Sequence, residues 1–155
     1  MTPRHRPLAG RVLLVVGAGD PVAREVALRA SALGAEVLAA GPALAPVVVT
    51  AGMIAARGAV VRVVEAPSPP LLGDPLLCVA RETLAPVTHA AVAASAFAGE
   101  DEARRATSDL ASVLGVERAA TVASLEGGAG PRAAAVSIVG RLFGDVAGGT
   151  EPPNR

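Results

Sequence analysis

The sequence predicts an α/β fold of three layers, in which helices cover both faces of a five-stranded parallel sheet. Two observations predict it. Short apolar runs alternate with turns and helical segments over most of the 155 residues, which is the pattern of parallel strands joined by crossover helices. The first run, residues 11–16, is apolar after its first residue, as in a strand buried on both faces of a parallel sheet. Right-handed crossovers then favour the strand order 3-2-1-4-5.

The first predicted helix, residues 21–33, follows the first strand after a short turn. Asp20 is a good N-cap residue, Pro21 suits the first helical position, and Gly34 can end the helix. Helical spacing predicts an apolar face toward the core and charged residues on the opposite face. The core-facing residues are Val22, Val26, Ala30 and Leu33, and the outward ones are Arg24 and Glu25.

The second predicted helix, residues 43–57, has almost no charge on any face. We expect Leu44, Val48, Ala51 and Ala55 to fall on its core side. A helix that is apolar all round is normally covered. The prediction is therefore that residues 43–57 pack against a second copy of the chain or another protein partner.

A membrane helix is an alternative for this part of the sequence. No charged residue occurs from Val37 to Ala56, about the ~20 residues that a membrane-spanning helix needs. Gly and Pro residues interrupt the segment at 41–42, 46 and 52, which favours a strand, a turn and an amphipathic helix. We therefore expect no contact with a membrane.

The remaining elements follow from the same alternation. Further strands are predicted at residues 36–40, 60–64, 88–94 and 118–123, and further helices at 74–84, 100–114 and 132–143. A short basic arm, 1–7, which we expect to be flexible, precedes the domain, 8–143. A Gly- and Pro-rich tail, 144–155, follows the domain and is expected to be disordered. The expected sheet core contains Val12, Leu14, Val16, Leu38, Val61, Val63, Val92 and Val122.

Composition excludes several classes of function. The chain has 14 basic and 14 acidic residues, every basic residue is Arg, and it contains no Tyr or Trp; a nucleic-acid-binding protein usually has a basic surplus and stacking aromatic residues. The single Cys78 lies in an apolar stretch and is interpreted as a small buried residue. One cysteine cannot form an internal disulfide, so nothing indicates an oxidising compartment and we expect a cytoplasmic protein. His5 and His89 are far apart, so no metal-ligand spacing is present and His89 is read as structural.

The turn after the first strand carries the clearest motif. Gly17-Ala18-Gly19 follows a strand and opens a helix, where glycine lets the backbone approach a pyrophosphate and the helix N-terminus supplies amide donors. Together with residues 33–41, the stretch 8–27 resembles the opening of the short-chain dehydrogenase/reductase family, whose turn reads Thr-Gly-x-x-x-Gly-x-Gly. Gly17 matches the first glycine of that turn, whereas Pro21 and Ala23 stand at the second and third. The resemblance implies a Rossmann-like domain that binds NAD or NADP.

The resemblance extends from about residue 8 to residue 143 and implies further site residues. Glu65-Ala66 is similar to the family's adenine-contacting Asp-Val, Ala93-Ala94 stands at its Asn-Asn-Ala-Gly, and Ser124 matches its catalytic Ser as a remnant. Val136 and Gly140 stand where the family has its Tyr and Lys. The cofactor-binding residues implied are Gly17, Ala18, Gly19, Asp20, Val22, Ala23, Glu65, Ala66, Ala93 and Ala94.

Three functions remain open at this point. The first is a divergent, truncated dehydrogenase-like protein that still binds NAD or NADP, weakly if at all, with little or no redox activity. The second is an active oxidoreductase that uses other residues or those of a partner. The third is a structural or interaction module that binds no cofactor. The Pro21 turn and the missing Tyr and Lys discriminate among these functions, because the family's chemistry needs a proton donor. They favour the first function, with the third as the alternative.

Overall fold

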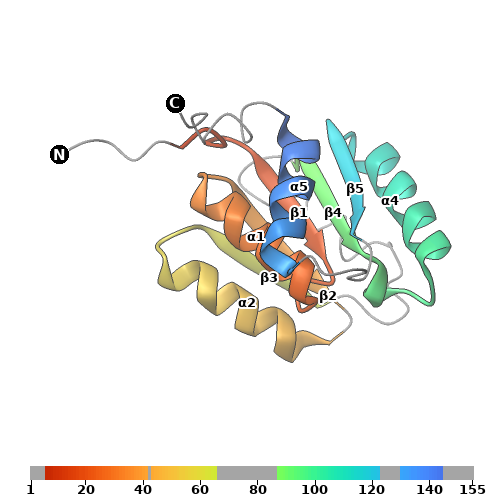
Figure 1. Cartoon of the computed structure of the whole chain (residues 1–155), viewed down its shortest axis with the longest axis horizontal. Coiled ribbons are helices and arrows are strands. Elements are labelled where there is room, and N and C mark those ends of the chain that lie inside the picture. Colours follow the sequence, from red (N-terminus) through yellow and green to blue (C-terminus); the bar gives the residue numbers. More distant parts are fainter. Residues whose placement is uncertain (1–5, 42, 66–86, 123–129, 145–155) are drawn as a thin grey trace.

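The computed structural model describes residues 6–41, 43–65, 87–122 and 130–144. Its five strands form one parallel sheet in the order β3-β2-β1-β4-β5 (Figure 1), which confirms the predicted order. The strands are β1 (Val12–Val16), β2 (Glu36–Gly41), β3 (Val61–Glu65), β4 (His89–Ala93) and β5 (Arg118–Val122). The helices are α1 (Pro21–Ala32), α2 (Leu44–Ala56), the 3-10 turn η1 (Ala94–Ala96), α4 (Glu100–Leu114) and α5 (Pro131–Phe143).

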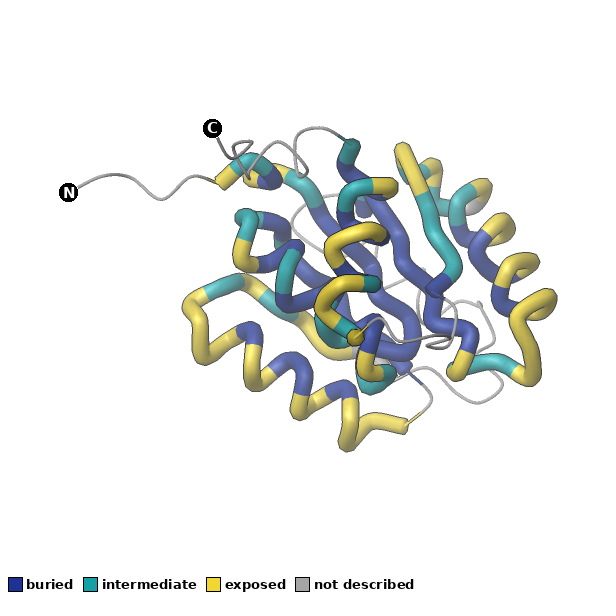
Figure 2. The backbone as a smooth tube through the Cα atoms, viewed as in Figure 1, coloured by how far each residue is buried: buried dark blue, intermediate teal, exposed yellow. Residues whose placement is uncertain are grey.

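Helices cover both faces of the sheet. The three helices α1, α2 and α5 pack on one face, and α4 packs on the other (Figure 1). Side chains of β1 alternate between the two layers, as a pleated strand requires: Leu13 and Val15 contact the first group of helices, and Leu14 lies in the core on the α4 side. All five residues of β1 are buried, and so is every residue of β4 (Figure 2).

The start of α1 follows the prediction closely. Asp20 is the N-cap, and one of its carboxylate oxygens accepts hydrogen bonds from the backbone amides of Val22 and Ala23. Pro21 occupies the first helical turn, where its missing N–H would in any case have no partner within the helix. Gly34 follows the helix with φ +107°, a conformation that favours glycine. These local signals fix where the chain turns from β1 into α1.

Two predicted helix faces are wrong in part. Arg24 does not point away from the protein: its Nε donates to Thr50 Oγ1 over 2.9 Å, which ties α1 to α2. On α2 the buried residues are Val47, Thr50, Ala51 and Ile54, whereas the predicted core residues Leu44, Val48 and Ala55 are exposed.

The predicted sheet core is confirmed except at β3. Val61 is only half-buried, and Val63 is 38% exposed. The reason is position, because β3 lies at the edge of the sheet and pairs only with β2 within the described chain. Val12, Leu14, Val16, Leu38, Val92 and Val122 are buried as expected.

Several predictions fall outside the described residues. These are the helix at 74–84, Cys78, Ala66, Ser124, most of the arm at 1–7 and all but the first residue of the tail at 144–155. The alternative of a membrane helix over 37–56 is wrong, because β2 and α2 divide that segment. No helix in the described ranges is both long and apolar enough to cross a membrane.

Candidate functional site

The turn between β1 and α1 is held by the neighbouring strand. The backbone amides of Gly17 and Ala18 both donate to the carbonyl of Ala40 in β2, over 2.7 and 3.1 Å. Gly17 has φ +81°, a value that an L-residue with a side chain rarely adopts. The Asp20 amide closes the turn by donating to the carbonyl of Gly17 over 2.9 Å. The turn is therefore a rigid connection at the carboxyl edge of the sheet.

Each glycine at this edge makes room for another part of the same chain. A Cβ atom on Gly17 would lie 2.7 Å from the Cβ of Ala93 at the end of β4. A Cβ on Gly19 would collide with Pro46 of α2. Internal packing thus accounts for both glycines of the motif, without any need for space beside a ligand.

A recess of about 310 Å³ lies beside this turn. It opens at the carboxyl ends of β1 and β2, next to β4, which is where parallel α/β sheets place their ligands. Its only polar side chains in the part of the chain that the structure describes belong to Asp20 and Ser95, and Ser95 Oγ donates to Asp20 Oδ1 over 2.8 Å. The lining residues are Gly17, Gly19, Asp20, Pro21, Gly41, Ala43, Pro46, Val47, Ser95 and Ala96.

Asp20 occupies the N-terminal end of α1, where a helix attracts anions. Its Oδ2 accepts from the amides of Val22 and Ala23 over 3.0 and 3.1 Å, and Pro21 has no amide to offer. A helix N-terminus attracts anions through free amides and its positive dipole. Here a carboxylate of the chain itself already fills that role, so the start of α1 offers little to a pyrophosphate.

The structure brings most of the predicted cofactor residues together. Ala93 ends β4 next to Gly17 and Ala94 begins η1, and both are buried. Glu65 ends β3 and pairs in register with Gly41, so its backbone lies at the same sheet edge with β2 between it and β1. The six residues of the turn and of the first turn of α1 lie together at the recess or directly beside it: Gly17, Ala18, Gly19, Asp20, Val22 and Ala23.

Sequence reasoning missed two polar residues of this site. Thr50 is fully buried, and its Oγ1 donates to the carbonyl of Ala18 over 2.7 Å, which holds α2 against the turn. Thr50 could have been found as the single hydroxyl side chain of an otherwise apolar helix. Ser95 could have been found as the only polar residue in the short apolar stretch after β4.

The residues at the family's Tyr and Lys positions do not line the recess. Val136 is 44% exposed and borders a groove of about 350 Å³ between α1 and α5, together with Glu25 and Arg132 of the two helices. Gly140 lies one turn further along the same helix. Because α5 packs on α1 and no α5 residue belongs to the recess lining, nothing on this helix supplies a proton-transfer group there.

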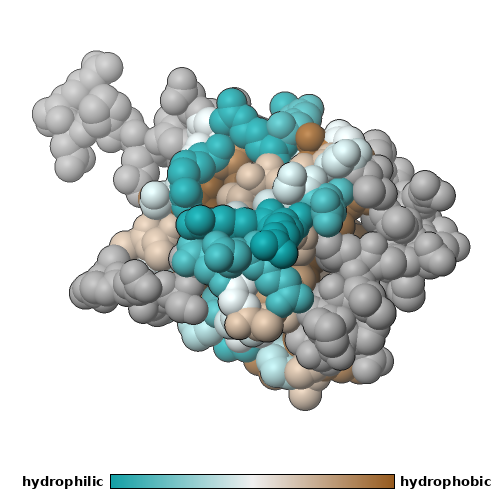
Figure 3. Space-filling view, turned by 90° about the vertical axis from the view of Figure 1, so that its right-hand side faces the viewer, coloured by the Kyte–Doolittle hydropathy of each residue, from teal (hydrophilic) through white to brown (hydrophobic). Residues whose placement is uncertain are grey.

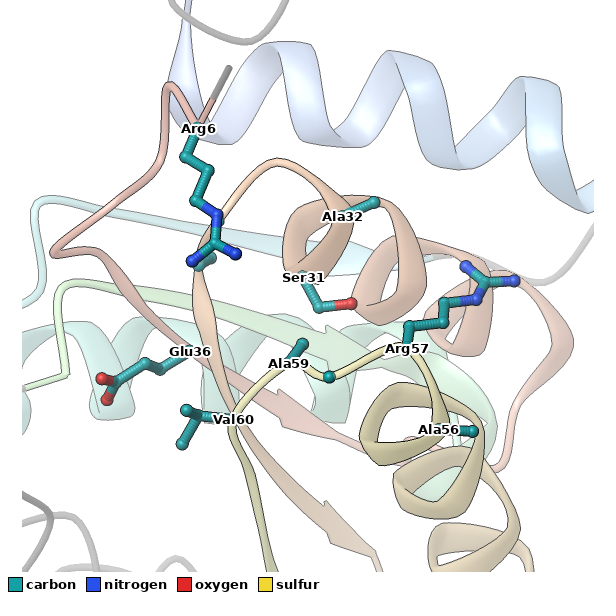
Figure 4. A pocket seen from close by; sticks show the side chains of 11 residues that line it. Arg6, Ser31, Ala32, Glu36, Ala56, Arg57, Ala59 and Val60 are labelled. Carbon is teal, nitrogen blue, oxygen red and sulfur yellow. The ribbon is translucent and has the colours of Figure 1, made fainter. Parts of the chain in front are cut away.

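A larger cavity of about 540 Å³ lies at the opposite, amino edge of the sheet. Figure 4 shows Arg6 directed into it from the start of the chain, with Arg57 from the end of α2 on its far side. The helices α1 and α2 both end here, and the negative ends of their dipoles favour such cations. The negative helix ends therefore account for the presence of Arg6 and Arg57 at this cavity.

His89 belongs to a cluster at the same amino edge. Its ring stacks on Phe143 with centroids 4.3 Å apart, Nδ1 lies 2.8 Å from Thr88 Oγ1, and Nε2 lies 3.6 Å from Glu117. Burial lowers the pKa of His89 below its usual 6.5; Glu117 opposes this shift and Arg11 adds to it. His89 is therefore a packed histidine far from the recess. Among the described residues, no three His, Cys, Asp or Glu side chains gather as metal ligands.

Comparison with known proteins supports the fold. The sequence matches no protein-family model, and no curated protein matches it. The structure is similar to the citronellol catabolism dehydrogenase of Pseudomonas aeruginosa PAO1, at 23% identity and a TM-score of 0.50, over 59% of this chain and 38% of that one. It is equally similar to a short chain dehydrogenase from Salmonella enterica serovar Typhi CT18, at 23% identity and a TM-score of 0.50, over 59% of this chain and 40% of that one.

The chain thus spans about two fifths of the length of these two enzymes. The shared part is a parallel sheet in the order 3-2-1-4-5 with helices on both faces, the architecture that the sequence predicted. The likeness confirms the resemblance at the level of the fold: this chain has the Rossmann-like fold of the short-chain dehydrogenases/reductases.

Proposed function

We propose that this chain is a redox-inactive domain of dehydrogenase ancestry that acts by binding another protein chain. One observation carries the first part of the proposal, the lack of redox activity. Within the described residues, Asp20 and Ser95 are the only polar side chains lining the recess, and they are hydrogen bonded to each other. Neither is free to donate a proton to a substrate carbonyl.

The chemistry of the resembled family supports the same conclusion. That chemistry needs a phenol as acid and base, with a lysine beside it, and general acid–base catalysis contributes about 10²–10⁴-fold in rate. The chain contains neither Tyr nor Lys. Ser124, the implied remnant of the catalytic serine, could orient a carbonyl but has no proton donor beside it in the motif.

A turnover assay tests the proposal. The purified chain is mixed with NADH or NADPH and a panel of aldehydes and ketones, and cofactor oxidation is followed by absorbance. We expect a rate equal to that of buffer. A rate that scales with protein concentration, depends on substrate and survives Ser124→Ala would contradict the proposal and reveal an unrecognised catalytic group.

A second candidate function is weak binding of NAD or NADP in the recess. It is favoured by the position of the recess, at the carboxyl edge of the sheet beside a glycine turn. Asp20 and Pro21 oppose it, because they occupy and remove the amide donors at the start of α1. Residues 41–43, Gly-Pro-Ala, contain no acid or Arg that could read the ribose 2′ position.

The surface of α2 supports a role in protein contacts. Four of its large apolar side chains are exposed by between 38% and 53%, namely Leu44, Val48, Val49 and Met53. No residue of α2 is charged. Exposed apolar surface gathered on one element commonly marks a protein interface, so residues 43–57 remain our proposed contact region.

A further inference from the structure

The outer side of α2 is uncharged along its whole length. We define the α2 stripe as its exposed residues that lie opposite the buried Val47, Thr50 and Ile54. In Figure 2 each turn of α2 is exposed on the side away from the sheet and buried on the side that faces it. The members of the stripe, spaced three and four residues apart, are Ala45, Val48, Val49, Gly52, Met53 and Ala56.

Another helix shows what a solvated face of this protein contains. The outer face of α4 carries acidic and basic side chains, including an ion pair between Glu100 and Arg104 at 2.8 Å. The side of the molecule that carries α4 is accordingly rich in hydrophilic residues (Figure 3). The outer face of α2 therefore differs from that of α4 in having no charged residue. A helix face without charge indicates that another surface covers it.

Gly52 lies near the middle of the stripe, and no packing within the described residues accounts for it. It is exposed, and a Cβ added to it would meet nothing within 4 Å. Glycine in a helix interior costs about 0.5–1 kcal/mol relative to alanine. A second helix crossing at this point would explain the residue, because a missing side chain lets two backbones approach closely.

The stripe matches itself when it is reversed. In an antiparallel pair of α2 helices related by a two-fold axis near the middle of the helix, Val49 faces Gly52 of the other copy and Val48 faces Met53. At the ends, Ala45 faces Ala56 of the other copy. A two-fold interface requires this kind of self-complementarity, because both subunits use the same surface.

The charges next to the stripe agree with the same arrangement. Exposed Arg57 directly follows the C-terminal end of α2, while the carboxylate of Asp20 lies near its N-terminal end, in the recess shared with Ala43 and Pro46. Antiparallel pairing brings the basic end of one copy toward the acidic end of the other. No charge is buried between them, since α2 contains none.

We infer that the α2 stripe is the two-fold interface of a homodimer, in which Val49 of one copy packs into the space over Gly52 of the other. The inference rests on the proposed role in protein contacts and names the partner as a second copy of this chain. A different protein as the partner is the competing outcome.

Sedimentation equilibrium tests the inference with two complementary charges. At high micromolar concentration the wild type should have twice the 15.2 kDa mass of one chain. Val49→Glu alone and Gly52→Lys alone should each be monomeric, because each places a charge in the apolar contact. An equimolar mixture of the two variants should recover the dimer, since the carboxylate introduced in one copy then faces the ammonium group introduced in the other.

Val136→Glu is the matched control, because Val136 is also an exposed helical valine but lies on α5. It should remain dimeric, and circular dichroism should show that all variants are folded. A monomeric wild type, a dimer that survives Val49→Glu, or a mixture that stays monomeric would overturn the inference. The turnover assay is independent of these results, so a failed dimer and a failed claim of redox inactivity can be told apart.

Discussion

Ser95 donates a hydrogen bond from Oγ to Asp20 Oδ1 over 2.8 Å and so joins the end of β4 to the start of α1. The other oxygen of the same carboxylate caps the helix through two backbone amides. The side chain that would have to leave before a phosphate could bind is therefore held at both oxygens. The chain itself therefore supplies an anion at the N-terminal end of α1.

The contact of Thr50 with Ala18 should contribute to stability. Thr50→Val removes the donor to the Ala18 carbonyl and the acceptor for Arg24 Nε, and leaves a buried carbonyl without that partner. We expect the free energy of unfolding to fall by about 1–3 kcal/mol in urea denaturation. Thr107→Val is the comparison for a buried threonine elsewhere: its hydroxyl bonds the carbonyl four residues earlier in its own helix and the hydroxyl of Thr121, and within the described residues it has no contact with α2. No loss of stability in Thr50→Val would show that α2 is not anchored through Thr50.

Gly17 and Gly58 allow backbone strain to be separated from steric collision. Their φ values are +81° and +78°, but a Cβ on Gly17 would lie 2.7 Å from the Cβ of Ala93, and a Cβ on Gly58 would meet nothing within 4 Å. Gly58→Ala should cost about 1 kcal/mol for its left-handed backbone alone. Gly17→Ala should cost more, because the turn must also move away from β4. Equal shifts in thermal midpoint for the two variants would contradict the tight packing at the turn.

The buried His89 should make stability depend on pH. Burial lowers its pKa in the folded protein below 6.5, so the unfolded chain binds a proton more readily. The free energy of unfolding should therefore decrease as the pH falls from 7 through 6.5, and continue to decrease until the folded-state pKa is passed. Denaturation curves of His89→Gln should show a weaker dependence over this range. His5→Gln separates the contribution of the other histidine, and a wild-type slope that survives His89→Gln would contradict the assignment.

The sequence was sufficient for the strands of the sheet and for the start of α1, because both depend on local signals, and the handedness of crossover connections then gave the sheet order. Apolar runs mark the buried strands, and Asp20 and Pro21 mark a helix start by their own chemistry. The face of α2 was not predictable in the same way. Apolar residues surround this helix, so periodicity allows more than one buried side. The hydrogen bond from Thr50 to Ala18 fixes the rotation, and that contact joins residues 32 positions apart.

The candidate site shows the same division between local and long-range information. The glycine turn could be found from its sequence and correctly placed at the carboxyl edge of the sheet. The residues that fill the space beside the turn could not be predicted, because Pro46 and Ser95 reach it from other elements. The exposure of Val63 likewise follows from the edge position of β3, a property of the whole sheet.

The most direct test is a calorimetric titration of NAD and NADP, oxidised and reduced, into the wild type, Pro21→Gly, and the double variant Asp20→Gly/Pro21→Gly. Each amide freed toward a phosphate is worth about 1.5–3 kcal/mol as a donor to a charged group. Glycine as an N-cap costs only a few tenths of a kcal/mol relative to Asp, so the helix should persist. We predict negligible or weak binding to the wild type, an affinity about tenfold or more higher in Pro21→Gly, and a further gain in the double variant. Tight binding of a dinucleotide by the wild type, unchanged in both variants, would contradict the account.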